Sequence, residues 1–326
     1  MDKEQTIHWG IIGLGKIAEK FATDMQKVSN SKIYAVASRT LEKAETFAKK
    51  HQATMAYGNY EELLSDPKID AIYIATPHSL HKENTLMCLQ NNIPVLCEKP
   101  LALNRFDVEN MINAAKENNT LLMEALWTYF LPHYQKVLEL LKQKHFGNII
   151  KLEADFGFKA NLEPEGRLYD KSLGGGSLLD IGIYPIFSAL TTLGIPKKTE
   201  AKATFFDNGA DATCDMIFYY DKAIAHLKST LVEDTKTEAI FTCETGVIKI
   251  NSRFHEPTTV TLISNNGEEK TLDFNYNSIG YNFETEHFNQ LIRTNKKESP
   301  IMSFQKSTEL IDLLDLIKAQ IGLSYQ

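Results

Sequence analysis

The stretch that decides the fold is residues 11–18, which read Ile-Ile-Gly-Leu-Gly-Lys-Ile-Ala. Its glycines and alanine follow a G-x-G-x-x-A pattern between an apolar run and an amphipathic segment. Gly13 permits a tight turn, Gly15 lets a pyrophosphate approach the backbone, and Ala18 keeps a helix close to a strand. Phosphates would lie at the helix N-terminus. The pattern predicts a dinucleotide site; a purely structural turn is the alternative, because glycine turns after strands are common.

The first 125 residues alternate between short β-branched runs and amphipathic segments of helical length. Strands are predicted at 7–12, 32–37, 69–75, 93–97 and 120–123, with a weaker one at 54–57, and helices at 17–28, 41–50, 60–65, 79–91 and 105–118. This alternation is typical of βαβ units, in which helices cover both faces of a parallel sheet. We therefore predict an α/β fold over residues 1–125, a doubly wound parallel sheet of the Rossmann type.

The pattern changes after residue 125. Helices are predicted at 129–146, 177–193, 281–294 and 304–321, and strands at 148–158, 199–206, 213–220, 223–231, 238–244, 246–250, 258–263 and 268–274. This predicts an α+β domain over residues 126–326 with a large open, mainly antiparallel sheet, the last helix being a candidate to pack back on the first domain. Helices are too few to cover both sheet faces, so a homodimer or higher homo-oligomer is expected through that sheet. Apolar residues that would need a cover are Leu227, Ile240, Val247 and Ile263.

Composition narrows the class of protein. The chain has 326 residues, which suggests two domains, and its net charge is 35 − 42 = −7. An acidic balance argues against nucleic acid as the partner, because phosphate binding needs a basic face. No apolar run approaches the ~20 residues of a membrane span, and no secretory leader is recognisable. The four cysteines form no CxxC pair, and no ligand cluster indicates a metal. We expect a soluble, cytoplasmic protein.

The end of the second predicted strand indicates which dinucleotide binds. An NAD site usually has a carboxylate there, for the ribose 2′-hydroxyl. Here the strand ends with Ser38, Arg39 and Thr40, and the first carboxylate is Glu42. A guanidinium and two hydroxyls suit a 2′-phosphate, so NADP(H) is preferred over NAD(H). The alternative is that Arg39 is a solvated residue at a helix start.

Polar residues also follow the other predicted strands, and ligands bind at the carboxyl ends of parallel strands. The residues expected to contact the cofactor are Gly13, Leu14, Gly15, Lys16, Ile17, Ser38, Arg39, Thr40, Thr76, Pro77, His78, His81, Glu98 and Lys99. For His78 and His81, a capping or surface role is an equal alternative. Glu98 and Lys99 directly follow an apolar run, which favours a functional role, and Pro100 is a candidate for a cis peptide bond.

A second set of candidate site residues, Asp180 and Tyr184, follows three glycines at 174–176. Asp180 and Tyr184 are four residues apart on a predicted helix, so they share one helix face. From spacing alone, they are equally a buried polar pair or a catalytic pair.

Together, residues 13–18, the Glu98-Lys99-Pro100 triplet and residues 174–185 resemble the Gfo/Idh/MocA family of NAD(P)-dependent oxidoreductases over nearly the whole chain. Residues 37–39, residues 123–128 and Tyr184 are most similar to its branch of dimeric dihydrodiol dehydrogenases and NADP-dependent D-xylose dehydrogenases. The resemblance implies a nucleotide-binding domain followed by an open sheet whose face often pairs between subunits. It also implies that Lys99 is the catalytic lysine, with Asp180 and Tyr184 as the catalytic aspartate and acid/base residue.

The reaction that follows is reversible hydride transfer between nicotinamide and a secondary alcohol of a small polyhydroxylated substrate, a sugar, polyol or cyclic trans-diol. Tyr184 would exchange the hydroxyl proton, the Lys99 ammonium would favour the phenolate and polarise the substrate oxygen, and Asp180 would orient Lys99 or a substrate hydroxyl. In the alternative assignment, Lys99 carries the proton and Tyr184 only binds. Trp127 and Arg167 are further candidates for substrate contact, each with an equally good structural alternative.

Two other classes of function stay open at this point. One is an NADP(H)-binding sensor or regulatory protein without net redox turnover. The other is an NAD(P)-assisted hydrolase or isomerase, which would form product without a net change in NADPH absorbance. The hydride-transfer reaction itself requires no metal.

Overall fold

A computed structural model describes residues 5–161 and 166–325, and these divide into two units. The first unit contains Met1–Trp127 and Ser278–Thr308, and the second contains Thr128–Asn277 and Glu309–Gln326. Each unit has its own sheet, which confirms the predicted fold class.

The sheet of the first unit has six parallel strands in the order β3-β2-β1-β4-β5-β6. The strands are β1 (Ile7–Ile12), β2 (Ser31–Ala37), β3 (Met55–Tyr57), β4 (Ala71–Ile74), β5 (Val95–Glu98) and β6 (Leu122–Ala125). This is the strand order of a dinucleotide-binding Rossmann fold. The side chains of β4, β5 and β6 are buried throughout, as expected of strands covered on both faces.

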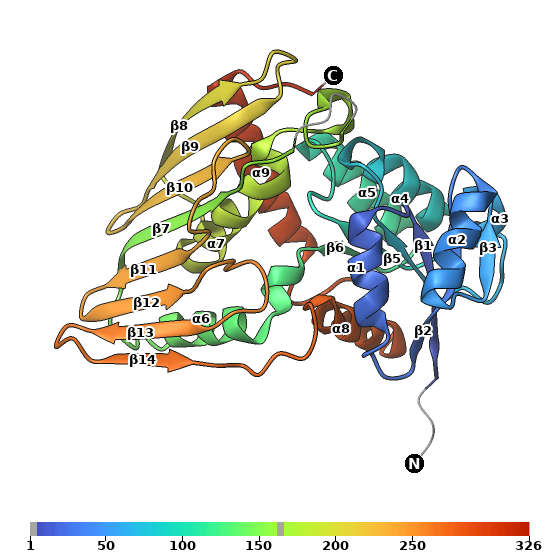
Figure 1. Ribbon diagram of the computed structural model, residues 1–326, viewed down its shortest axis with the longest axis horizontal. Coiled ribbons are helices and arrows are strands. Elements are labelled where there is room, and N and C mark those ends of the chain that lie inside the picture. The colour runs from blue at the N-terminus through green and yellow to red at the C-terminus, as the bar shows by residue number, and fades with distance from the viewer. Residues whose placement is uncertain (1–4, 162–165, 326) are drawn as a thin grey trace. The chain divides into compact units, whose positions relative to one another are not determined.

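Helices of the first unit connect these strands (Figure 1). They are α1 (Lys16–Met25), α2 (Leu41–His51), α3 (Tyr60–Leu64), α4 (His81–Gln90) and α5 (Arg105–Glu117). Helix α8 (Tyr281–Arg293) also belongs to this unit, but it follows the strands of the second unit in the sequence. The helix predicted over 79–91 is divided into a 3₁₀ turn, His78–Leu80, and α4. Strands β5 and β6 end later than predicted, so Glu98 and Glu124 lie within strands rather than after them.

One segment of the expected second domain belongs to the first unit. Asp24 of α1 is fully buried and accepts the backbone N–H groups of residues 279–281, at 2.7–3.0 Å, at the start of α8. Trp9 Nε1 donates to Asn289 Oδ1 at 3.1 Å. A single boundary at residue 125 was expected, but residues 278–308 belong to the first unit. Their hydrogen-bond partners Asp24 and Trp9 lie near the N-terminus.

The sheet of the second unit has eight strands in the order β14-β13-β12-β11-β7-β10-β9-β8. The strands are β7 (Ile149–Gly157), β8 (Lys198–Phe205), β9 (Asp211–Tyr219), β10 (Ile224–Thr230), β11 (Ala239–Cys243), β12 (Gly246–Ile250), β13 (Val260–Ser264) and β14 (Glu269–Leu272). Strands β7 and β10 pair in parallel, and the other neighbours are antiparallel. The large, mainly antiparallel sheet predicted for this half is confirmed.

The helices of the second unit differ from the predicted ranges in two places. The helix predicted over 129–146 is shorter: a 3₁₀ turn, Trp127–Phe130, precedes α6 (Pro132–Lys142), which begins at its proline because the residue before a proline disfavours helical geometry. The helix predicted over 177–193 begins as a π-helical turn, Leu178–Gly182, and continues as α7 (Ile183–Leu193). The final helix, α9 (Phe304–Ile321), has its predicted bounds, and the division between units falls within it.

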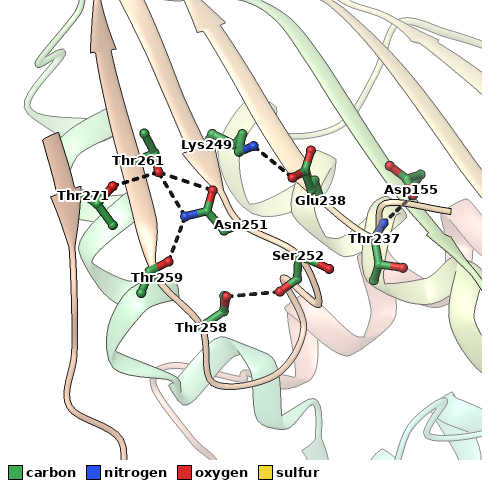
Figure 2. A network of polar contacts seen from close by, with 10 residues as sticks. All are labelled: Asp155, Thr237, Glu238, Lys249, Asn251, Ser252, Thr258, Thr259, Thr261 and Thr271. Atoms are coloured by element: carbon green, nitrogen blue, oxygen red, sulfur yellow. Dashed lines mark hydrogen bonds and ion pairs between the residues drawn. The ribbon is translucent and has the colours of Figure 1, made fainter. Parts of the chain in front are cut away.

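Helices α6, α7 and α9 lie on one face of the eight-stranded sheet, and none of the helices in the described part of the chain covers its other face (Figure 1). Leu227 is on the helix-covered face and only 2% exposed. Ile240, Val247 and Ile263 alternate to the other face and are half-buried. Polar groups share that face: Figure 2 shows the ion pair of Lys249 with Glu238, at 2.9 Å, within a network of threonines and an asparagine. The open face is thus mixed rather than purely apolar.

Within the described residues, only Lys171–Leu193 is long and apolar enough to cross a membrane. Its most apolar window is 94% buried inside the protein, which is typical of a core helix. The segment therefore gives no support for a membrane-spanning role.

Candidate active site

The loop between β1 and α1 is tightly packed at one glycine and open at the other. Gly13 has φ +91°, and a Cβ there would lie 2.5 Å from the Ala75 carbonyl carbon and the Thr76 nitrogen. A Cβ on Gly15, which caps α1, would meet no atom within 4 Å. Ala18 is fully buried, so helix and strand are in close contact. These residues fit a dinucleotide, whose pyrophosphate needs a close approach to the backbone at a helix N-terminus.

The residues around this loop differ in exposure. Leu14 is buried, Lys16 is exposed and Ile17 is half-buried. At the end of β2, Ser38 is buried, and its backbone N–H donates to Tyr57 O at 3.2 Å. Arg39 and Thr40, the next two residues, are exposed, so a guanidinium stands at the position where an NAD site usually has a carboxylate.

The segment after β4 connects two strand ends. Thr76 and His78 are buried, Pro77 is half-buried, and His81 is fully buried. The His81 ring has Nδ1 2.8 Å from Pro100 O and Nε2 3.0 Å from Thr76 O. Its contacts with two backbone carbonyls support the structural alternative for His81, since they fix the segment after β4 against the segment after β5.

The Glu98-Lys99-Pro100 triplet begins on the last residue of β5, and the Lys99–Pro100 peptide bond is cis. The Tyr73 hydroxyl of β4 donates to Glu98 Oε1, and the Lys99 backbone N–H donates to Glu98 Oε2 at 3.3 Å. Lys99 is only 9% exposed. The carboxylate of Glu98 is thus oriented by the neighbouring strand and by the backbone of the lysine itself.

Two further buried carboxyl groups belong to the first unit, and neither was singled out as a site residue from the sequence. Glu124 lies opposite Cys97 in the β5–β6 ladder and accepts the Leu101 backbone N–H at 2.9 Å. Burial raises the pKa of Glu124 to about 7, although hydrogen bonds from Ser307 and Leu101 and the charge of Lys99 act in the opposite direction. Burial, followed by the charge of Glu98, raises the pKa of Glu284 on α8 well above its ordinary value. Both carboxyl groups are therefore harder to ionise than an exposed glutamate.

In the second unit, the three glycines lead directly into the π-helical turn. Gly174 and Gly176 have φ of +82° and +115°, and a Cβ on Gly176 would lie 2.1 Å from Asp211 Oδ1. Asp211 Oδ2 accepts the Leu178 backbone N–H at 2.7 Å. The buried Asp211 carboxylate thus fixes the start of the turn, and only a residue without a side chain fits beside it.

Asp180 and Tyr184 are not on one regular α-helical face, because Asp180 lies in the π-helical turn and Tyr184 lies in α7. Asp180, 6% exposed, accepts Arg167 Nη1 at 2.9 Å. Tyr184, also 6% exposed, has its ring centroid 5.7 Å from that of Phe156 and 5.1 Å from that of His255. The structure therefore brings Arg167 and Asp180 together and surrounds Tyr184 with aromatic rings.

Trp127 has a structural environment within the first unit. It is 2% exposed, and its ring is stacked on that of Tyr281 at 4.5 Å with an interplanar angle of 5°. This supports the packing alternative for Trp127. Because Tyr281 begins α8, the contact also ties the end of the first sheet to the returning segment.

His255 is the main residue near Tyr184 that the sequence did not indicate. It follows β12 in an irregular segment, where no periodic pattern or motif includes it. Its neighbourhood depends on β7 and α7, which are distant in sequence.

A Rossmann sheet, an open phosphate loop and buried ionisable groups at the strand ends define a dinucleotide-binding oxidoreductase. Two family models match: "Oxidoreductase family, NAD-binding Rossmann fold" over residues 7–126 and "GFO/IDH/MocA C-terminal domain" over residues 134–249. The chain belongs to the Gfo/Idh/MocA family, which confirms the predicted resemblance.

Relatives and solved structures agree with this family. The chain is 37% identical to a trans-1,2-dihydrobenzene-1,2-diol dehydrogenase of Xenopus tropicalis, over 97% of this chain and 98% of the relative. The Homo sapiens enzyme of that name is 32% identical, over 98% of each. The fold is similar to that of KijD10, a 3-ketoreductase from Actinomadura kijaniata in complex with NADP and TDP-benzene, with a TM-score of 0.87, 25% identity and coverage of 97% and 98%. The predicted enzyme class, an NAD(P)-dependent dehydrogenase or reductase, is confirmed.

Proposed function

We propose that the protein is an NADP(H)-dependent oxidoreductase that transfers a hydride between nicotinamide and a CH–OH or carbonyl carbon of a small polyhydroxylated compound. The proposed substrate class is a sugar, a polyol or a cyclic trans-diol. The observation that carries the proposal is the open loop at Gly15 together with the buried Glu98-Lys99-Pro100 triplet, which begins at the last residue of β5 in the same parallel sheet. Related dihydrodiol dehydrogenases and a ketoreductase that binds NADP support this choice.

The preference for NADP(H) depends on the end of β2. The exposed Arg39 guanidinium would contact the 2′-phosphate, with the Ser38 and Thr40 hydroxyls as further donors, whereas no carboxylate there suits the 2′-hydroxyl of NAD. The residues proposed to hold the remainder of the cofactor are Gly13, Leu14, Gly15, Lys16, Ile17, Thr76, Pro77, His78, Glu98 and Lys99. His81 would position the segments after β4 and β5 through its contacts with Thr76 O and Pro100 O. When bound, nicotinamide supplies the hydride chemistry.

The protein supplies position and proton transfer. In reduction, we propose that the Tyr184 hydroxyl donates its proton to the substrate oxygen, and in oxidation the Tyr184 phenolate takes that proton back. The Lys99 ammonium stabilises the negative charge that develops on the same oxygen. Asp180, oriented by its 2.9 Å contact with Arg167, binds a substrate hydroxyl or orients Lys99. In the alternative assignment Lys99 carries the proton.

Turnover assays test the proposed reaction. Purified protein is supplied with aldoses, polyols and cyclic trans-diols, each with NADP+ and with NAD+, while NADPH or NADH absorbance is followed. We expect reduced cofactor with one substrate class and a preference for NADP+. Cofactor binding without turnover, in the presence of either these alcohols or their carbonyl counterparts, would favour a sensor. Product formed without a net absorbance change would favour a hydrolase or isomerase.

Single substitutions test the residue roles. Tyr184→Phe keeps the ring and removes the hydroxyl, so we expect kcat to fall by ~10²–10⁴-fold with NADP(H) binding retained. Lys99→Met keeps a long side chain without charge, and we expect a loss in kcat of similar size. The matched control is Tyr220→Phe, which removes only a hydroxyl bonded to Gly194 O at 3.3 Å and should leave kcat unchanged. A folded Tyr184→Phe enzyme at the wild-type rate would refute the role of Tyr184.

We also propose that the enzyme acts in the cytoplasm. The cysteines, Cys88, Cys97, Cys214 and Cys243, are free and buried, which suits a reducing compartment. Expression of a tagged protein followed by fractionation tests this, and recovery from a secreted fraction would contradict it.

A further inference from the structure

A buried imidazole lies beside the proposed acid/base residue of the second unit. His255 is 4% exposed, and its ring centroid is 5.1 Å from that of Tyr184, with an interplanar angle of 45°. The same imidazole is stacked on Phe156 of β7 at 4.0 Å. Thr128 Oγ1 donates to the His255 backbone carbonyl at 2.7 Å. Phe156 therefore packs against the ring, and Thr128 fixes the backbone of the residue that places this ring beside Tyr184.

An ionised carboxylate also lies beside this imidazole. His255 Nε2 is 3.5 Å from Glu256 Oε1, and Arg253 binds both oxygens of Glu256, at 2.6 and 2.7 Å. Burial opposes ionisation of Glu256, but hydrogen bonds from His255 and Arg253 hold its pKa well below the ordinary value. A carboxylate at this distance favours the protonated, cationic form of the imidazole.

A second histidine close to this segment, His133, is compatible with that cation. His133 of α6 is fully buried, and burial, together with the charge of His255, lowers the pKa of His133 to about 4. His133 Nε2 is 3.0 Å from Phe254 O, and Nδ1 is 2.6 Å from the Tyr276 hydroxyl. A neutral His133 that donates from Nε2 and accepts at Nδ1 satisfies both contacts. His133 thus fixes the backbone before His255 without adding a like charge at neutral pH.

We propose that His255 is a positioning residue for Tyr184, and that its imidazolium, held by the Glu256–Arg253 pair, sets the pH range in which Tyr184 transfers its proton. This rests on the proposed function of Tyr184. A positive charge near the ring stabilises the phenolate relative to the phenol. At about 5 Å and an effective dielectric constant of about 20, such a charge lowers the pH of phenol ionisation by about two units. Burial alone would raise the pH of phenol ionisation, and the imidazolium acts against this effect from within the second unit.

The test is the pH dependence of kcat/KM in the oxidation direction. His255→Gln keeps a polar side chain that can donate to Glu256 but carries no charge. We therefore expect the part of the pH profile that reports ionisation of Tyr184 to move upward by about two pH units. NADP(H) binding should be unchanged. Glu256→Gln leaves the imidazole in place and weakens its protonation, so a smaller shift in the same direction is expected. The matched control is His145→Gln, at an exposed histidine of the same unit, which should leave the profile unchanged.

A second readout needs no substrate. Nuclear magnetic resonance of ring-labelled tyrosine, assigned with Tyr184→Phe, follows ionisation of Tyr184 directly in wild type, His255→Gln and Glu256→Gln. An upward shift in both variants is expected. If Tyr184→Phe abolishes turnover but neither variant moves the profile or the tyrosine titration, the inference about His255 is wrong while the proposed function stands. If Tyr184→Phe is fully active, the proposed role of Tyr184 fails, and the titration alone decides whether the two rings are coupled. Should His255→Gln fail to fold, Glu256→Gln decides the same question.

Discussion

Glu124 gives the sharpest prediction about stability. Its carboxyl group is fully buried in β6, and burial raises its pKa from 4.5 to about 7. Because the pKa is higher in the folded than in the unfolded state, the folded protein binds this proton more tightly. The stabilising contribution is therefore complete below about pH 4.5 and is lost as the pH rises through about 7.

The size of this effect follows from the shift. A difference of 7 − 4.5 = 2.5 pKa units corresponds to about 3.4 kcal/mol, at about 1.4 kcal/mol per unit. About 2.5 kcal/mol of this change falls between about pH 5 and pH 8. Glu124→Gln keeps the shape, can still accept the Leu101 backbone N–H, and cannot ionise. We therefore expect the free energy of unfolding of the variant, relative to wild type, to rise by about 2.5 kcal/mol across that range.

Urea unfolding followed by tryptophan fluorescence measures this difference. Both tryptophans, Trp9 and Trp127, belong to the first unit, so the signal reports the unit that contains Glu124. Glu117→Gln, at an exposed position on α5, is the matched control and should show no pH-dependent difference. A Glu124→Gln protein whose stability stays parallel to wild type from pH 5 to pH 8 would refute the reasoning.

Three further predictions concern the cofactor loop and the open sheet. Gly13→Ala should lower the melting temperature, because the added Cβ would lie 2.5 Å from backbone atoms. Gly15→Ala should leave the melting temperature unchanged but weaken NADP(H) binding, because a Cβ there meets no protein atom within 4 Å. Two variants with the same melting temperature and the same NADP(H) affinity would contradict this difference. Arg39→Ala should weaken NADP(H) by about ten- to a hundredfold, from a loss of roughly 1.5–3 kcal/mol, and NAD(H) much less; equal losses would exclude the 2′-phosphate contact. Light scattering should detect a homodimer that Val247→Asp or Ile263→Asp dissociates, whereas a wild-type mass of 36.9 kDa at micromolar concentration would rule the dimer out.

The sequence predicted those parts of the fold that depend on local pattern. The alternation of apolar strands and amphipathic helices led to the six-stranded parallel sheet, and hairpin-rich segments led to the eight-stranded sheet. Contacts between distant segments left no such signal. Asp24 looks like an ordinary helix residue, yet it accepts three N–H groups from residues 279–281. The π-helical turn at Leu178–Gly182 was also missed, because its residues fit an α-helix equally well.

In the candidate site, too, the sequence predicted the local motif but not the contacts between distant segments. Gly13 and Gly15 stand in a motif whose spacing has a direct physical reason, and the structure gives each the expected environment. Trp127 and His81 were proposed as ligand contacts because they follow strands, but their environments are internal. His255 had no motif, since its relation to Tyr184 exists only once β7 and α7 bring Phe156 beside both rings.

The return of the chain to Asp24 has a consequence for synthesis on the ribosome. The cofactor-binding motif is among the first parts to emerge, but the N–H groups that satisfy Asp24 lie more than 250 residues later, and so does Asn289, the partner of Trp9. Until those residues leave the exit tunnel, α1 carries a carboxylate and β1 an indole whose hydrogen-bond partners have not yet been made. The first unit is therefore completed almost last. Residues 1–127 alone will not serve as a transplantable nucleotide-binding module, and a nonsense mutation before α8 will destroy the unit that the chain began with.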